Sequence, residues 1–233
     1  MNVVSKILYD SIQGSAPILL CILGGIFAYK ANVLNISLEG MMLVGAYFSC
    51  LVTIYSGHYI LGIIAGILAS LVFAIIFSYF GTKLKGNVII IGLALNMLAT
   101  ALTTFLLKVM GVAELVATNY VVNDYRIRIP VIDSIPLVKS LLSNHTLLTW
   151  FTYLLIPIMF VFMFKTPLGL HIRVVGENEN AAVSIGLKAN KLKYIAILIG
   201  GVTCGLAGAS LAMDELGGIF TPGMTTGRGF IAI

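Results

Sequence analysis

The chain has 233 residues, of which 59% are apolar and 10% are charged, and its mean hydropathy is +1.05. Soluble domains carry about 25% charged residues, so this composition excludes a soluble globular protein and indicates an integral membrane protein. The net charge is +5, but the charges are dispersed between apolar runs and form no basic patch interleaved with aromatic residues, which argues against nucleic-acid binding.

The apolar runs have the length of roughly 20 residues that a helix needs to cross a hydrocarbon core of about 30 Å. Lipid offers no partners to backbone amides, so such segments form helices, whereas a barrel would show alternating segments of about ten residues. The sequence therefore predicts an all-α polytopic transmembrane helix bundle, a single domain over residues 1–233, with six full spans and the start of a seventh. The predicted spans are residues 12–29, 36–55, 59–81, 88–107, 147–164 and 194–213.

Two longer polar segments separate these spans: residues 108–146, predicted as an external loop, and residues 165–193. On the side that holds residues 165–193, the loops carry eight Lys and Arg residues against two Glu residues. The loops on the other side carry six basic against six acidic residues. Because positively charged loops remain in the cytoplasm, we expect residues 165–193 inside the cell and the N-terminus outside.

Glu39 is the only carboxylate within a predicted span, and it follows a break in the apolar pattern at residues 30–35. Two interpretations stay open. Asn35 can cap a helix that restarts after the break, and Glu39 then favours the positive end of the helix dipole. An ionisable residue inside a membrane also marks functional sites, so Asn35 and Glu39 are candidates for the substrate path or its gate.

The fourth predicted span has a polar, uncharged face formed by Gly92, Asn96, Thr100 and Thr103. Such a face can make hydrogen bonds between helices, or it can line a translocation path. Asn96 and Thr100 are therefore further candidates for the substrate path.

Other features of the spans indicate packing. Small residues at helical spacing in the sixth span, Gly201, Gly205, Gly208 and Ala212, predict close helix contacts. The three cysteines lie in apolar runs and are predicted to be small core residues. The three histidines are widely spaced in loops, so no metal site is predicted.

Within residues 165–193 the sequence predicts a short helix from about Glu179 to Ile185. Asn178 or Glu177 can cap its start, and Gly186 supplies a left-handed stop.

Ala181, Ala182 and Ile185 are predicted to form a small apolar face on that helix. No P-loop pattern of the form G-x-x-x-x-G-K-[ST] occurs in the chain, so energy for uphill transport would come from another subunit. The short helix is the expected receiver of that energy. The alternative is an amphipathic helix that lies on the lipid surface.

Four motifs, in order along the chain, resemble the permease subunits of bacterial ABC importers. The subfamily serves branched-chain amino acids, ribose-type sugars and nucleosides, and the similarity is greatest to its simple-sugar and nucleoside branch. The motifs are Asn35-Ile-Ser-Leu-Glu-Gly-Met-Met42, Gly92-Leu-Ala-Leu-Asn96, Arg173-Val-Val-Gly-Glu-Asn178 with Ala181, Ala182 and Gly186, and a last one that contains Gly227, Arg228, Gly229 and Phe230.

The resemblance implies a permease of the bacterial cell membrane without enzymatic activity of its own. Its partners would be a second permease subunit, two ATP-binding subunits that hold ATP and Mg²⁺, and an extracellular binding lipoprotein. Residues 177–186, preceded by Gly176, would form the coupling helix that docks on the ATPase. A nucleoside or a simple sugar would then cross by alternating access.

Relatives in this family continue through several further spans after the Gly227 motif. We therefore expect an incomplete sequence or a truncated gene product that lacks its C-terminal spans. Two other functions are compatible with the residues. One is a secondary transporter driven by protons or sodium that uses the broken helix at Asn35 and Glu39, and the other is an assembly subunit that transports nothing.

Overall fold

The computed structural model describes residues 3–117, 126–127 and 145–233. Within these ranges six helices are long and apolar enough to cross a membrane, which confirms the predicted all-α polytopic bundle. They are α1 (Val3–Lys30), α2 (Leu38–Ser56), α3 (Tyr59–Ser78), α4 (Val88–Val109), α6 (Leu147–Lys165) and α9 (Ala189–Ala209). Two of them continue as wider π-helical turns, α3 into η1 (Tyr79–Lys83) and α9 into η4 (Ser210–Glu215).

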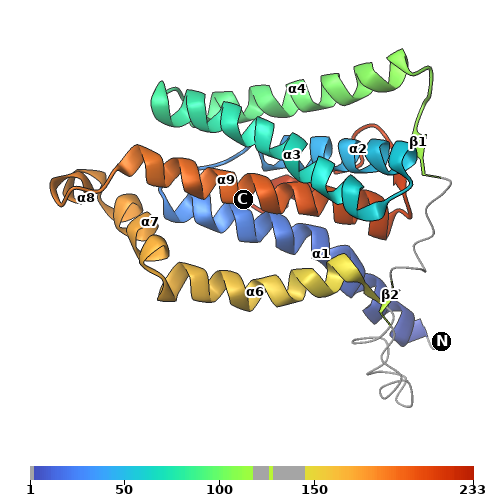
Figure 1. Ribbon diagram of the computed structural model, residues 1–233, viewed down its shortest axis with the longest axis horizontal. Coiled ribbons are helices and arrows are strands. Elements are labelled where there is room, and N and C mark those ends of the chain that lie inside the picture. The colour runs from blue at the N-terminus through green and yellow to red at the C-terminus, as the bar shows by residue number, and fades with distance from the viewer. Residues whose placement is uncertain (1–2, 118–125, 128–144) are drawn as a thin grey trace.

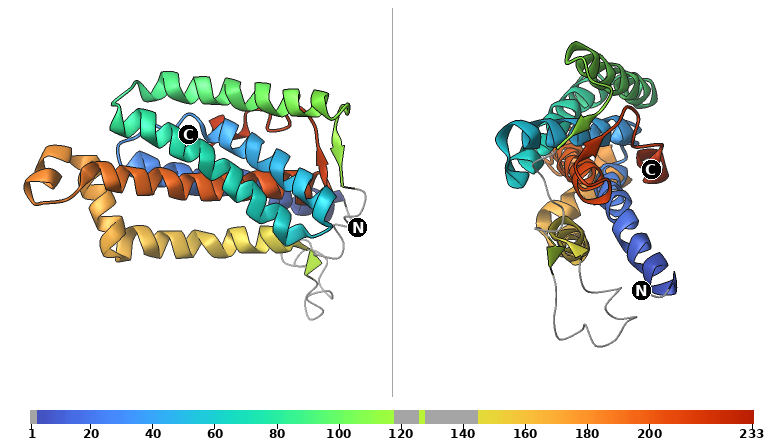
Figure 2. Two further views of the ribbon diagram at one scale, coloured as in Figure 1. Left: turned by 45° about the horizontal axis from the view of Figure 1, so that its top comes forward. Right: turned by 90° about the vertical axis from the view of Figure 1, so that its right-hand side faces the viewer.

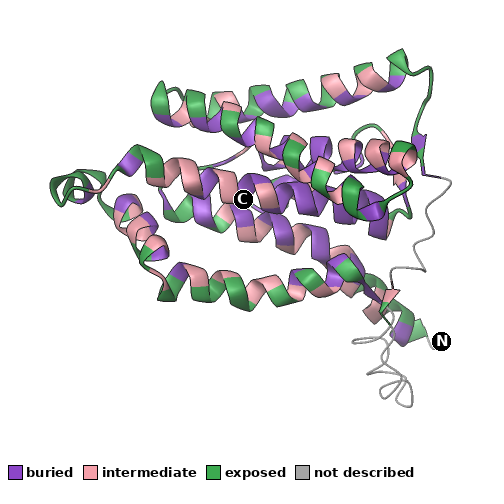
Figure 3. Cartoon of the chain, viewed as in Figure 1, coloured by how far each residue is buried: buried purple, intermediate pink, exposed green. Residues whose placement is uncertain are grey.

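The long helices run side by side, with α2 and α9 in the centre (Figure 1). Helix α9 packs against α1, α2 and α3, while α4 lies at one edge of the bundle and α6 at the other. Burial is greatest in the centre of the bundle. Helix α9 is buried over most of its length, whereas the outer sides of α4 and α6 are exposed (Figure 3). The outer faces are apolar, as expected for surfaces that meet lipid.

The small residues predicted along α9 lie where neighbouring helices approach most closely. A side chain at Gly208 would collide with the backbone of α2 at Met42, and one at Gly205 would strike α3 at Ile67. Lipid tails are as apolar as leucine, so helices in a membrane associate through such close packing. Helices α2, α3 and α9 therefore form a tight central unit.

The helices differ from the predicted spans mainly at their ends. Helix α1 starts at Val3 rather than near residue 12, and α9 starts at Ala189 rather than near residue 194. At its other end α9 continues through η4, so Asp214 is 2% exposed although it was placed outside the span. The Tyr59 hydroxyl donates to Asp214 Oδ1 at 2.9 Å and Thr146 Oγ1 donates to Oδ2 at 2.7 Å.

The expectation that Glu39 is the only carboxylate inside the bundle is therefore wrong. A buried carboxylate is costly unless hydrogen bonds compensate it, and the two hydroxyl donors to Asp214 come from distant parts of the sequence.

In the described part of the chain, four two-residue strands pair beyond the ends of these helices. Strand β1 (Leu115–Val116) pairs with β4 (Ile219–Phe220), and β2 (Arg126–Ile127) pairs with β3 (His145–Thr146), both antiparallel. The β1 pairing ties the segment after α4 to the segment after η4. Most of the predicted external loop, residues 118–125 and 128–144 of 108–146, lies outside the described residues.

The opposite end of the bundle carries two shorter helices, α7 (Pro167–Glu177) and α8 (Glu179–Ser184), and α8 projects beyond the long helices (Figure 2). Only α8 was predicted. Helix α7 begins at a Thr-Pro pair, in which the Thr166 hydroxyl accepts from the Gly169 amide at 3.3 Å and proline occupies the first helical position. We call this the α8 end of the molecule.

Candidate functional site

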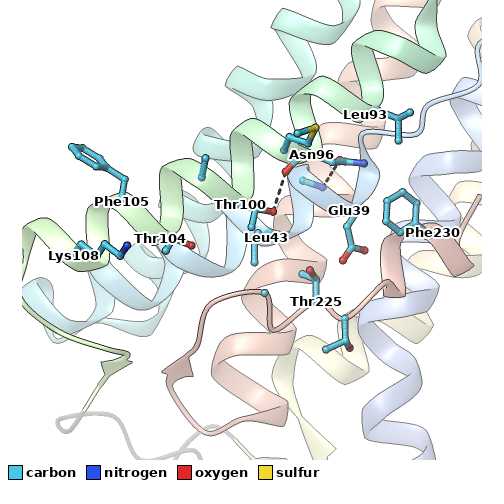
Figure 4. A pocket seen from close by; sticks show the side chains of 15 residues that line it. Glu39, Leu43, Leu93, Asn96, Thr100, Thr104, Phe105, Lys108, Thr225 and Phe230 are labelled. Carbon is cyan, nitrogen blue, oxygen red and sulfur yellow. Dashed lines mark hydrogen bonds between the residues drawn. The ribbon is translucent and has the colours of Figure 1, made fainter.

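A cavity of about 850 Å³ lies between α2, α4 and the C-terminal segment (Figure 4). Three of the four residues predicted for the substrate path, Glu39, Asn96 and Thr100, line this cavity. Asn35 does not line it. In Figure 4 the side chains on α4 follow one wall, and Glu39 and Phe230 lie on the opposite side.

The break between α1 and α2 lies just before Glu39 and Gly40, which line this cavity. The segment of residues 31–37 runs back from the α8 end, so that α2 begins well inside the bundle (Figures 1 and 2). Asn35 is 3% exposed, and its Oδ1 accepts from the Ser37 amide at 3.1 Å and the Ser37 hydroxyl at 2.6 Å. Asn35 therefore holds the turn before α2, and the residue at the cap position is Ser37.

Asn96 caps α2 from the neighbouring helix. Its Oδ1 accepts from the Gly40 amide at 2.8 Å, and its Nδ2 donates to the Ile36 carbonyl at 2.9 Å. Ile36 belongs to the broken segment and Gly40 to the first turn of α2, where amides lack a partner within their own helix and lipid could not supply one. The close approach depends on Gly92, because a Cβ there would lie 3.0 Å from Ile36. Asn96 therefore fixes α4 to the start of α2.

We expect Asn96→Leu to destabilise the protein by about 2–6 kcal/mol, because two buried backbone groups would each lose a partner at about 1–3 kcal/mol. Thermal unfolding of the purified protein in detergent measures the change. Thr100→Val is the matched control, since the Thr100 hydroxyl donates only to the Asn96 carbonyl of its own helix. Equal melting temperatures for the two variants would contradict the capping role of Asn96.

Glu39 connects the start of α2 to the last motif of the chain. Its Oε1 accepts from the Gly227 amide at 2.9 Å and its Oε2 accepts from the Gly229 amide at 2.6 Å. These amides lie at the start of the short helix α10 (Arg228–Ile231), and a side chain at Gly229 would collide with the Glu39 backbone. The carboxylate thus lies at the positive ends of two helices, α2 and α10. We call these two hydrogen bonds the Glu39 clasp.

Arg228 does not pair with Glu39, although it lies between the two glycines of the clasp. Its guanidinium donates to Glu215, with Nη2 at 2.7 Å from Oε1. This ion pair ties α10 to η4, so α10 is held on both sides.

The cavity contains polar residues that were not predicted: Thr104, Lys108, Thr225 and Thr226. On α4, Asn96, Thr100, Thr104 and Lys108 recur every four residues, and this spacing was available in the sequence. The predicted face included Thr103 instead, which is fully buried and donates to the Ala99 carbonyl of its own helix. Since 3.6 residues form a turn, positions 103 and 104 both lie next to Thr100, and only packing decides between them.

The second predicted site lies at the α8 end. Asn178 Oδ1 accepts from the Ala181 amide at 3.0 Å, so Asn178 is the cap of α8, and Gly186 has a left-handed φ of 87°. The predicted cap at Asn178 and the predicted left-handed residue at Gly186 are therefore both confirmed. The helix ends at Ser184, one residue before the predicted end.

The three apolar residues predicted as one face of α8 differ in burial. Ala182 is fully buried against Val175 and Ala189, whereas Ala181 is exposed and Ile185 is 71% exposed. Ala182 is rotated from Ala181 by about 100° and from Ile185 by about 60°, and of the three only Ala182 packs against α7 and α9. Ala182 therefore anchors α8, whereas Val183 on the helix and Ile185 just after it leave apolar side chains exposed.

Two further contacts fix the α8 end. The Lys193 ammonium on α9 pairs with Glu179 of α8 at 2.7 Å. At Gly176 a side chain would collide with the Lys30 carbonyl, so α7 lies directly against the end of α1. Glu177 is exposed. Helix α8 thus contacts both α7 and α9, and α9 is one of the two central helices.

The residues around the cavity combine polar and apolar side chains. Around the cavity the polar groups are hydroxyls, one amide, one carboxylate and one ammonium, set among apolar side chains, a lining that suits a small polar solute. No group of three or more His, Cys, Asp or Glu side chains within the described ranges could hold a metal ion. The three cysteines are buried and unbridged, as predicted for core residues.

Similar proteins share nearly the whole length of this chain. The chain is 35% identical to TsgC13 of Haloferax volcanii, a permease protein provisionally assigned to glucose ABC transport, over 100% of this chain and 70% of that protein. It is 32% identical to the guanosine ABC transporter permease protein NupQ of Bacillus subtilis, and 28% identical to the nucleoside ABC transporter permease protein NupC of Lactococcus lactis. These alignments cover 100% of this chain and 75% and 76% of the relatives.

No solved structure matches the chain. Residues 7–233 match the family described as the permease component of branched-chain amino acid transport systems. The match includes all four motifs, two of which meet in the Glu39 clasp. The chain belongs to this family of permease components, and it is a membrane permease of an ABC importer.

Proposed function

We propose that this permease moves a nucleoside or a simple sugar through the cavity between α2 and α4. The observation that carries the proposal is the lining of that cavity, where Thr100 and Thr104 offer hydroxyls beside the apolar Phe105 and Phe230. A solute with several hydroxyl groups and one flat apolar face fits such a surface. The sugar and nucleoside assignments of the relatives support this substrate class.

Residues 176–186 act as the coupling element in this proposal. ATP and Mg²⁺ bind to a separate ATP-hydrolysing subunit, and the permease itself catalyses nothing. The exposed Ile185 face of α8 docks on that subunit. Glu177 and Asn178 begin the docking segment, and Gly186 ends it.

Contacts within the bundle provide a path from α8 to the cavity. Ala182 and the Lys193–Glu179 ion pair join α8 to α9, so the two move together. Helix α9 contacts α2 without intervening side chains at Gly208, and the first turn of α2 carries Glu39. A displacement of α8 therefore reaches the Glu39 clasp, which acts as the gate of the cavity.

In this proposal the α8 end lies in the cytoplasm and the N-terminus lies outside a bacterial cell membrane, an orientation that the charge distribution supports. In this arrangement residues 1–233 belong to one transmembrane permease domain. A second permease subunit covers the open side of the cavity along α4, and an extracellular binding lipoprotein delivers the solute. Secondary transport driven by an ion gradient is the contrasting mechanism.

Uptake by a reconstituted complex tests the proposed function. We expect vesicles with the permease pair, the ATPase and the binding lipoprotein to accumulate a radiolabelled nucleoside or sugar when ATP is supplied, and to stop when ATP is withheld. Complexes with a hydrolysis-deficient ATPase are the control. Accumulation driven by a proton or sodium gradient in the absence of ATP would contradict the proposal.

A further inference from the structure

A second hollow, of about 690 Å³, lies at the α8 end and is separate from the substrate cavity. Helix α8 and the start of α9 form one wall, and the turn from η1 into α4 forms the opposite wall, with the turn after α1 between them. Six of the residues that line it carry amide or charged side chains: Asn32, Lys85, Glu179, Asn180, Asn190 and Lys193. We call it the α8 cleft.

The backbone is unusual on two sides of this cleft. Three non-glycine residues in the described part of the chain have positive φ, and two of them, Asn32 at 57° and Lys85 at 52°, line the α8 cleft. The third, Thr226, lines the substrate cavity. A left-handed conformation is unfavourable for lysine, and such residues concentrate at binding and switch regions. The turn would form more easily with glycine at position 85, which indicates a use for the lysine side chain.

The charged residues that line the α8 cleft differ in whether they have an ion-pair partner. Lys193 already pairs with Glu179, whereas Lys85 is exposed and has no ion-pair partner among the described residues. The cleft therefore offers one free ammonium group among amides, a surface that suits a peptide segment with a carboxylate. Glu179 lies in the wall opposite Lys85 and is already paired with Lys193, so it does not compensate the Lys85 ammonium.

The far wall of the cleft leads directly to the substrate cavity. Val88, the first residue of α4, lines the cleft, and Asn87 caps the helix by accepting from the Ile89 amide at 3.0 Å. The same helix carries Asn96 and Thr100 in the cavity. A force applied at Lys85 would thus act on α4 without passing through α9.

We propose that the α8 cleft receives a carboxylate-bearing segment of the ATP-hydrolysing subunit. This inference rests on the proposed function and adds a second contact to the one made by Ile185. One subunit would then hold both α8 and the start of α4, and closure of the ATPase would change the distance between them. Helix α4 would move against α2 at the cavity in the same step.

Site-specific photocrosslinking in the purified whole complex tests this contact. Benzoylphenylalanine replaces Lys85 in one sample and Ile185 in another, and mass spectrometry identifies the crosslinked species. We expect both positions to crosslink to the ATPase subunit. A crosslink at Ile185 with only lipid, or nothing, at Lys85 would overturn the second contact and leave the proposed function intact. Failure of both positions to reach the ATPase would overturn both.

Uptake by two further variants tests the contact at Lys85 functionally. Lys85→Gly suits the positive φ and removes only the side chain, so we expect unchanged thermal stability and uptake lowered by about fivefold or more. Lys191→Ala is the matched control, because it also removes one exposed lysine side chain but from a position that does not line the cleft, and uptake should stay within about twofold of the parent. Full uptake by Lys85→Gly would overturn the proposed contact.

Discussion

Replacing Glu39 by glutamine is expected to lower uptake by about tenfold or more. The neutral side chain keeps one acceptor oxygen for the amides of Gly227 and Gly229 and turns an NH₂ group toward the other amide. Hydrogen bonds to charged groups contribute about 1.5–3 kcal/mol, so the clasp would weaken by one to two orders of magnitude. Initial uptake rates in reconstituted vesicles, at equal amounts of permease, measure the effect.

A matched control separates the clasp from a general effect of charge. Glu114 is an exposed carboxylate after α4 that does not line the cavity, so Glu114→Gln should transport at the parent rate. Equal uptake by the two glutamine variants would contradict a gating role for Glu39. If uptake fell by the same factor in Glu39→Gln and Glu114→Gln, the cause would be the change in net charge.

Replacing Ile185 by aspartate is expected to uncouple the permease from its ATPase. The Ile185 side chain is 71% exposed in the isolated permease, so its loss should leave the melting temperature unchanged. An aspartate in an apolar docking groove would have to be desolvated without a partner, and we expect uptake to fall by about tenfold or more. Co-purification with the ATPase and solute-stimulated ATP hydrolysis report the loss.

Ile185→Leu is the control, because it preserves apolar area, and it should transport normally. Ala182 is unsuitable for this test, although the sequence groups it with Ile185. It is fully buried against Val175 and Ala189, so a charged residue there would detach α8 from the bundle. Normal uptake by Ile185→Asp would remove α8 from the coupling path.

Local chemistry explains what could be predicted at the α8 end. Capping involves residues close together in sequence, so Asn178 and Gly186 were recognisable as the two ends of a helix. The Thr166–Pro167 start of α7 is an equally local signal, which the sequence analysis missed because the apolar pattern there is short. The direction in which Ala182 points depends on α7 and α9, and no local signal contains it.

The contacts that build the cavity could not be predicted in the same way. The Glu39 carboxylate meets the amide of Gly227, 188 positions later, and Asn96 meets Gly40 across 56 positions. The residue types and the motifs were recognisable, but their pairing follows from the packing of α2, α4 and the C-terminal segment. Asp214 was misplaced for the same reason, since its hydroxyl donors come from α3 and β3.

The central claim is that motion of α8 opens and closes the cavity at Glu39, and labelling of a cysteine in the cavity tests it most directly. Thr100→Cys would introduce the one accessible thiol of the described structure, because Cys21, Cys50 and Cys204 are fully buried. In the assembled complex, we expect the rate of labelling by a membrane-impermeant thiol reagent to change by about tenfold when ATP binds. The change should vanish when Ile185→Asp is added. Two results would contradict the account: an equal response of the labelling rate to ATP in the complexes with Ile185 and with Ile185→Asp, or no response to ATP in either complex.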